Sequence, residues 1–294
     1  MTGTVWVNPA FKPYLDAQRL GGREFAENAG QVSSLFGIPY NIAVGRSNQF
    51  PVEYGLANGV LQVAKKQLEV SGIVSDPKVI IIGKGKRPTI MYTTWVIGSP
   101  HRNPLTNYLV SGVEHEAAYG LTSEPTHEFP YHFHVPKEIL ITRGYASYAE
   151  PGEPFDGLRD AIEKGGSSQE GKEIAMRMWS NLRRKREEPA TTLIGPRGEL
   201  VPEYYGGPGY LDRFTRDYWT ITRMPLHNEE TRWMGQNFVV LAGCHDLGTL
   251  HAVSALCDRE VLEETNHLRG HQSFQIVGYG DKDGDRGIYN TVVF

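Results

Sequence analysis

Residues 96–103 read VIGSPHRN, and residues 240–247 read VLAGCHDL. The two stretches align without a gap. Each contains the end of an apolar run, a turn through a small residue, a histidine and the start of a helical pattern. The order of strand, turn and helix is the unit from which α/β proteins are built, so the two stretches predict this fold class.

The chain before the first stretch alternates strand and helix patterns. Three short apolar runs are typical of buried strands: residues 40–44, 78–82 and 90–97. Between the first two runs, apolar residues recur at the spacing of one helix face, at Leu56, Val60, Val63, Ala64 and Leu68. Gly72 is a suitable end for this helix. After the third run, Asn103 is expected to cap a helix that begins at Pro104.

The chain around the second stretch alternates in the same way. We expect helices from about residue 248 and near 260–268, and strands at 218–223, 238–242, 273–280 and 288–294. The segment DKDGDRG, residues 281–287, predicts an antiparallel hairpin turn between the last two strands. It does not match a calcium loop, because Arg286 replaces the glycine and Val292 replaces the final glutamate of that motif.

Strands that alternate with helices predict a mostly parallel, doubly wound, Rossmann-like sheet with helices on both faces. An antiparallel C-terminal hairpin is expected at one edge. Residues 150–210 differ from the rest, since charged helical segments alternate there with turns rich in glycine and proline. We therefore expect an α/β core formed by residues 1–149 and 211–294, and a helical and loop insertion or cap at 150–210.

The composition excludes several classes of partner. The 294 residues are 39% hydrophobic and 22% charged, as in proteins with a sizeable core. The net charge of -4 and the pI of about 6.2 provide no basic field for nucleic acid. No apolar run approaches the ~20 residues of a membrane span, and no signal-peptide pattern opens the chain. With free thiols expected at Cys244 and Cys257, these features predict a cytoplasmic protein. A homo-oligomer is compatible with them.

The two quoted stretches also form the candidate ligand site. In an open α/β sheet, ligands bind at the carboxyl ends of strands, and the helix N-terminus that follows favours an anion. Neither stretch is a dinucleotide fingerprint or a P-loop. We assign ligand contacts to Ser99, Arg102, Asn103, Gly243, Gly248 and Thr249. His101 and His245 are the candidate acid/base groups, because an imidazole titrates near neutrality, and both are expected to border one cleft.

The segment THEFPYHFHVPKEIL, residues 126–140, is a candidate metal site. On a strand, alternate side chains point to opposite faces. Phe129, Tyr131 and Phe133 are therefore expected to face the core, and His132 and His134 to point away from it. Two imidazoles at alternate positions suit chelation of Zn²⁺, Fe²⁺ or Ni²⁺, but we expect this pair to be structural because a third ligand is not evident.

The stretch HFHVPKEILITRG resembles the first motif of the cupin family, in which HxH is followed by a glutamate and then a glycine. The resemblance covers only residues 132–144 and implies His132, His134 and Glu138 as metal ligands, with Gly144 at the turn. Thr126 stands where the motif has a glycine, and no second motif follows at the usual distance. We therefore do not assign the chain to this family. Other third ligands for a metal at this pair would be His127, His115 or Glu116.

These patterns together predict a protein that binds a small anionic or nucleotide-like ligand at the carboxyl ends of its strands. In the enzymatic form of this hypothesis, His101 or His245 is the acid/base group. One alternative is a non-catalytic sensor or assembly subunit that uses the same cleft. Another is a transition-metal-dependent enzyme that uses His132 and His134. The sequence identifies no cofactor and does not decide whether the chain is an enzyme.

Overall fold

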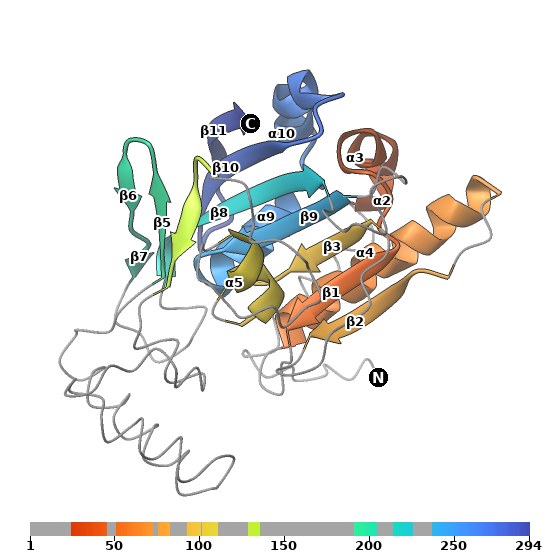
Figure 1. Ribbon diagram of the computed structural model, residues 1–294, viewed down its shortest axis with the longest axis horizontal. Coiled ribbons are helices and arrows are strands. Elements are labelled where there is room, and N and C mark those ends of the chain that lie inside the picture. Colours follow the sequence, from red (N-terminus) through yellow and green to blue (C-terminus); the bar gives the residue numbers. More distant parts are fainter. Residues whose placement is uncertain are drawn as a thin grey trace, which may run out of the picture.

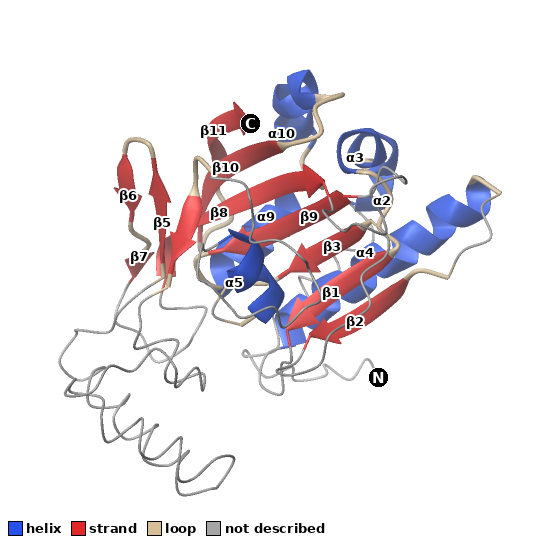
Figure 2. Cartoon of the chain, viewed as in Figure 1, coloured by secondary structure: helices blue, strands red, loops and turns tan. Residues whose placement is uncertain are grey.

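The structure is a computed structural model that describes residues 25–45, 51–72, 76–82, 93–100, 102–110, 129–135, 191–204, 214–225 and 237–294. Its main feature is an eight-stranded mixed sheet flanked by helices (Figures 1 and 2). Seven strands follow the order β11-β10-β8-β9-β3-β1-β2, and β7 pairs with β8 off this path. The strands are β1 (Asn41–Gly45), β2 (Lys78–Ile82), β3 (Thr94–Ile97), β7 (Glu203–Tyr204), β8 (Phe214–Pro225), β9 (Asn237–Gly243), β10 (Phe274–Asp281) and β11 (Arg286–Val293).

Four neighbouring strands of this sheet are parallel. β1 pairs with β2 on one side and with β3 on the other, and β3 pairs with β9. Every residue of β1 and β3 is buried, as expected for strands that are covered on both faces. The prediction that the runs at 78–82, 90–97 and 238–242 share one sheet is confirmed, since they contribute β2, β3 and β9.

The other half of the sheet is antiparallel. β8 pairs in this way with both β9 and β10, and β10 and β11 form the predicted C-terminal hairpin. The sheet is therefore mixed, and the mostly parallel, Rossmann-like arrangement is not confirmed. Only residues 226–236 separate β8 from β9. This length is close to the minimum of about a dozen residues for a parallel crossover, whereas an antiparallel connection needs far fewer.

Helices cover one face of the sheet, and a helix with a small second sheet covers the other (Figure 2). The first face packs against α2 (Phe25–Glu27), α3 (Ala29–Phe36), α4 (Pro51–Val70), α9 (Asp246–Ala255), α10 (Arg259–Glu264) and the 3₁₀ turn Thr265–Leu268. The second face packs against α5 (Pro104–Val110) and the small sheet. Helices thus lie on both faces, as the sequence predicts.

The helices α4 and α5 follow their sequence patterns. The predicted apolar stripe of α4 is buried at Leu56, Val60, Val63, Ala64 and Leu68. Gly72 follows the helix with φ +69°, a conformation that glycine adopts without strain. α5 begins at Pro104, and Asn103 Oδ1 accepts a hydrogen bond from the backbone N–H of Leu105 at 3.1 Å. The predicted cap at Asn103 is confirmed.

The small sheet is antiparallel and contains β4 (His132–His134), β5 (Thr192–Gly195) and β6 (Gly198–Leu200). Gln275 on β10 anchors it to the main sheet. The Tyr131 N–H donates to Gln275 Oε1 at 3.0 Å, and Gln275 Nε2 donates to the Tyr131 carbonyl at 2.8 Å. β5 and β6 belong to the stretch 150–210, whose predicted helices lie outside the described residues.

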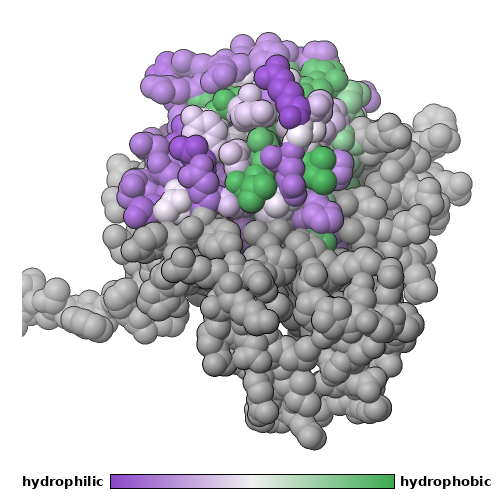
Figure 3. Space-filling view, turned by 90° about the vertical axis from the view of Figure 1, so that its left-hand side faces the viewer, coloured by the Kyte–Doolittle hydropathy of each residue, from purple (hydrophilic) through white to green (hydrophobic). Residues whose placement is uncertain are grey.

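The surface on the side of the small sheet is mixed in polarity. In the coloured part of Figure 3, hydrophobic residues are scattered among hydrophilic ones. Within the described ranges, no helix has both the length and the apolar character that crossing a membrane requires.

Candidate functional site

β1 and β3 end at the same edge of the sheet, but the helices that follow them lie on opposite faces (Figure 1). α4 follows β1 and packs against the first face through Leu56 and Val60. α5 follows β3 and packs against the second face through Leu105 and Leu109. In open α/β sheets, such a divergence opens a crevice at the carboxyl ends of the two strands, where ligands bind.

The loop after β3 packs against a buried carboxylate from α4. Glu53 is 2% exposed, and its Oε1 accepts a hydrogen bond from the Ser99 N–H at 3.3 Å. Gly98 has φ +133°, and a Cβ added there would lie 2.9 Å from the carboxylate carbon of Glu53. Both the backbone conformation and this close approach require glycine at position 98.

The side chains of Asn103 and Ser99 differ in their hydrogen bonds. Asn103 Nδ2 donates to the carbonyls of Ala43 at 3.2 Å and Ile97 at 3.0 Å, which joins the ends of β1 and β3. Its Oδ1 caps α5, so the polar atoms of Asn103 have partners inside the chain. Ser99 Oγ is buried and has no hydrogen-bond partner within the part of the chain that is described. A buried hydroxyl without a partner costs free energy, so Ser99 is a candidate contact for a bound molecule.

An ion pair connects the loops after β3 and β9. Arg102 Nε lies 2.7 Å from Asp246 Oδ1, and the two side chains are 5% and 4% exposed. The two stretches that share a sequence pattern, 96–103 and 240–247, therefore contact each other through opposite charges. Removing both charges from water offsets most of their attraction. The main consequence of the pair is that one loop is fixed relative to the other.

Asp217 on β8 holds the N-terminus of α9. Its Oδ2 accepts hydrogen bonds from the N–H groups of His245 at 3.0 Å and Gly248 at 2.6 Å, and its Oδ1 accepts one from the Tyr218 N–H at 2.9 Å. The pKa of Asp217 is raised to about 7, chiefly by burial and also by the charge of Asp246, although the three N–H groups act to lower it. Two N–H groups that an external anion would use at this helix are therefore already occupied by a carboxyl group of the chain.

The predicted ligand residues after β9 form a tight turn. A Cβ added to Gly248 would lie 2.8 Å from Gly243 Cα, so the two glycines allow close packing of the backbone. Thr249 Oγ1 accepts a hydrogen bond from the Gly243 N–H at 3.1 Å and donates one to the His245 carbonyl at 3.2 Å. The sequence pattern suggested that a ligand would approach the backbone closely at these glycines. In the structure, the backbone of the chain itself makes that approach.

The structure describes only one of the two candidate acid/base groups. His245 is buried at the start of α9, in an extended backbone conformation. His101 lies outside the described residues, so the expected cleft between the two histidines stays a prediction. Burial raises the pKa of the Cys244 thiol well above its ordinary value. This cysteine is therefore a protonated thiol and not a nucleophile.

The histidine-rich strand β4 lies with its aromatic side chains toward the core. Tyr131 and Phe133 are buried as predicted, whereas Phe129 is only partly buried and packs edge-on against Phe294 at 5.3 Å between ring centroids. Val135 is also buried. The alternation of faces along this strand is thus confirmed.

His132 is half-buried and His134 is exposed, so both point away from the core as predicted. Burial lowers the pKa of His132, and so does the charge of His134, while a hydrogen bond with the Phe129 backbone raises it. No group of three His, Cys, Asp or Glu residues suited to a metal is found among the described residues. The other candidate ligands of the pair lie outside them: Glu138, His127, His115 and Glu116.

No family model, curated protein or solved structure matches this chain. A functional interpretation therefore depends on the chemistry of the site itself. Sequence reasoning missed the acids Glu53, Asp217 and Asp246. A signal was present for Asp217, because a single acid within the strand pattern TRDYWTIT is unusual in a buried strand. Asp246 follows His245 directly and could have been recognised as a first-turn acid of the predicted helix.

Proposed function

We propose that this protein binds a small nucleotide-like molecule at the carboxyl ends of β1 and β3, with the loop after β9 as one wall. The buried Arg102–Asp246 ion pair carries the proposal, because it joins two loops at the edge where α/β sheets hold ligands. Such a pair contributes little net stability. A role in shaping a binding site is therefore a better account of its presence than a role in folding.

The charges at this edge favour a ligand that donates hydrogen bonds. The carboxylate of Glu53 is buried there beside the Ser99 N–H. The carboxyl groups of Asp217 and Asp246 are also buried, but they are engaged by the start of α9 and by Arg102. Carboxylates accept hydrogen bonds from ribose hydroxyl groups in dinucleotide-binding sheets, whereas they repel a phosphate at short range. Of the two ligand classes that the sequence suggests, the nucleotide-like one is favoured, with its sugar directed to Glu53. The hydroxyl group of Ser99 would make one further hydrogen bond to it.

If the site is catalytic, a histidine would be its acid/base group. His245 directly precedes α9 beside the buried Asp217, and His101 lies in the sequence between β3 and α5. An imidazole can take up and return a proton near neutral pH, which suits general acid/base catalysis. In the non-catalytic alternative, the same site binds its ligand as a sensor and has no turnover. The free thiols Cys244 and Cys257 support a cytoplasmic location for either form.

The test is equilibrium binding of adenosine, adenosine monophosphate and a dinucleotide by isothermal titration calorimetry. We expect the parent to bind at least one of them. Ser99→Ala should bind it about two- to tenfold more weakly, the effect of one hydrogen bond. Because Ser99 Oγ has no partner among the described residues, the variant should be as stable as the parent or more so. Unchanged binding by Ser99→Ala, or no binding by the parent, would refute the proposal.

Thr191→Val is the matched control for this experiment. Thr191 Oγ1 is also buried without a partner among the described residues, but it precedes β5 in the small sheet. The control removes the same kind of hydroxyl group and should leave binding unchanged. His245→Gln then separates the two forms of the proposal: an enzyme loses turnover of the bound compound, as followed by chromatography, and a sensor has no turnover to lose.

A further inference from the structure

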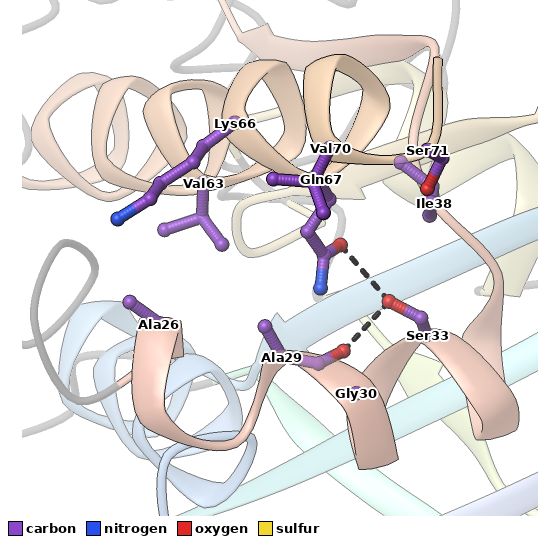
Figure 4. A pocket seen from close by; sticks show the side chains of 10 residues that line it. All are labelled: Ala26, Ala29, Gly30, Ser33, Ile38, Val63, Lys66, Gln67, Val70 and Ser71. Carbon is purple, nitrogen blue, oxygen red and sulfur yellow. Dashed lines mark hydrogen bonds between the residues drawn. The ribbon is translucent and has the colours of Figure 1, made fainter. Parts of the chain in front are cut away.

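A groove between α2–α3 and the second half of α4 lies apart from the loops described above (Figure 4). Its volume is about 390 Å³, within the range of small-molecule sites in proteins. Lys66, which lines the groove, and Glu53, which lies at the sheet edge, are separated by about 20 Å along α4 at 1.5 Å per residue. The groove is therefore a second site, and its function does not rest on the proposed nucleotide site.

The walls of the groove are mainly apolar, formed by Ala26, Ala29, Ile38, Val63 and Val70. Val70 is 82% exposed, although it is a large aliphatic residue. On the α3 side, Gly30 leaves the groove open, since a Cβ added there would meet no atom within 4 Å. A ligand that fills this space would remove apolar surface from water, which is favourable.

A hydrogen bond joins the two helices beside the groove. Ser33 Oγ lies 2.9 Å from Gln67 Oε1 and 2.6 Å from the Ala29 carbonyl oxygen. Figure 4 shows the Ser33–Gln67 contact joining α3 to α4, whereas the contact with the Ala29 carbonyl lies within α3. The Ser33–Gln67 hydrogen bond thus connects the two walls of the groove.

Lys66 supplies the positive charge of the groove. Its side chain extends along the α4 side of the groove (Figure 4) and has no ion-pair partner in the described part of the chain. The neighbouring Lys65 differs, because its Nζ lies 3.2 Å from Asp76 Oδ1. The groove thus combines apolar walls with one cation, which complements a molecule with an apolar body and one negative charge.

We propose that this groove binds a small amphipathic carboxylate. Its apolar body lies between α3 and α4, and its carboxylate meets the Lys66 ammonium group. Apolar contact supplies most of the affinity, since an exposed ion pair of this kind changes affinity only a few-fold. The charge selects the acid over an uncharged molecule of the same shape.

The probes are octanoate and octanamide, which share an apolar chain and differ in charge. Binding is measured by isothermal titration calorimetry and by chemical-shift changes in NMR spectra at low ionic strength. We expect octanoate to bind more tightly than octanamide. Lys66→Gln should weaken octanoate binding about two- to fivefold and leave octanamide unchanged. Lys65→Gln is the matched control and should leave both affinities unchanged.

Gly30→Leu tests the groove itself. Leucine favours a helix more than glycine does, so the thermal midpoint of this variant should equal or exceed that of the parent. Its side chain should fill the groove and abolish binding of both probes. Equal binding of the two probes, an unchanged affinity in Lys66→Gln, or octanoate binding that survives in Gly30→Leu would overturn the proposal. So would a change of oligomeric state in Gly30→Leu by sedimentation, because the groove would then be a contact between two copies of the chain.

Discussion

Arg102 and Asp246 join the carboxyl ends of two adjacent parallel strands, with 2.7 Å between Nε and Oδ1. β3 and β9 are in register up to the pair Ile97 and Leu241, and the Gly98 N–H still donates to the Leu241 carbonyl at 3.1 Å. The ion pair continues this contact beyond the end of both strands. The two loops are therefore held together by both the backbone hydrogen bond and the ion pair.

Arg102→Met should lower the free energy of unfolding by about 3–5 kcal/mol, the usual cost of leaving one buried charge without its partner. The Asp246 carboxyl group would be left without its cation in a site where its side chain is only 4% exposed. Urea denaturation followed by circular dichroism measures the change. A double variant, Arg102→Met with Asp246→Asn, removes both charges and should lose less than Arg102→Met alone. A loss below about 1 kcal/mol in the single variant would mean that the pair behaves as an exposed one.

Asp217 should make the protein less stable as the pH rises from acid to neutral. Burial raises its pKa from 3.8 to about 7, so between these values the folded protein holds a proton that the unfolded chain has released. Stability falls with pH wherever the folded state binds more protons than the unfolded state. The contribution of Asp217 is therefore complete below pH 3.8 and is lost as the pH rises through about 7.

Asp217→Asn removes this titration and keeps a side-chain oxygen for the N–H groups at the start of α9. Unfolding free energies of parent and variant are compared at about pH 5 and about pH 8. We expect the parent to lose more stability between the two pH values than the variant does. Equal losses in the two proteins would show that Asp217 is not the proton-binding group.

The sequence predicts the parts of the fold that depend on local spacing. The stripe from Leu56 to Leu68 defines α4 because it repeats with the helical period, and Gly72 and Pro104 mark helix boundaries through backbone conformation alone. Strand direction is a different kind of property, since it depends on the length and path of the connection. The antiparallel pairing of β8 with β9 is such a case, and alternation of strand and helix patterns does not reveal it.

The small sheet and the buried acids could not be predicted, because both depend on contacts between residues far apart in the chain. β4 is three residues long and pairs with β5, which follows more than fifty residues later. Asp217 acts on His245 and Gly248 from a neighbouring strand, and Glu53 acts on Ser99 from another helix. The sequence placed Ser99 and Arg102 in a candidate ligand loop, but it did not indicate that Arg102 is neutralised by the other loop.

Gly98→Ala should destabilise the protein more than Gly198→Ala does. The two glycines have similar φ angles, +133° and +117°, so the backbone strain of an alanine is of the same order at both. Such strain costs about 1–3 kcal/mol. Only at Gly98 would the added Cβ also press on the Glu53 carboxylate, whereas at Gly198 no atom lies within 4 Å. The difference between the two variants in urea denaturation measures that contact, and equal losses would contradict the position of Glu53.

The last prediction concerns His132 and His134, which we expect to hold no metal ion tightly. Both lie on the outer face of β4, where Ile194 and Glu199 also lie by the strand register. Glu199 Oε1 accepts a hydrogen bond from Thr192 Oγ1 at 2.6 Å, so this carboxylate is already engaged. Two imidazoles alone are fewer than the three or four protein ligands of ordinary zinc sites.

The measurement is elemental analysis of protein purified without a histidine tag, beside a His132→Ala, His134→Ala double variant. We expect little transition metal in either protein. The free energy of unfolding should change by no more than about 0.5 kcal/mol, as is usual for surface positions. Near-stoichiometric metal in the parent that is lost in the double variant would contradict this prediction. A ligand from outside the described residues, such as Glu138, would then complete the site, and a metal-dependent reaction at β4 would replace the nucleotide-like site as the leading hypothesis.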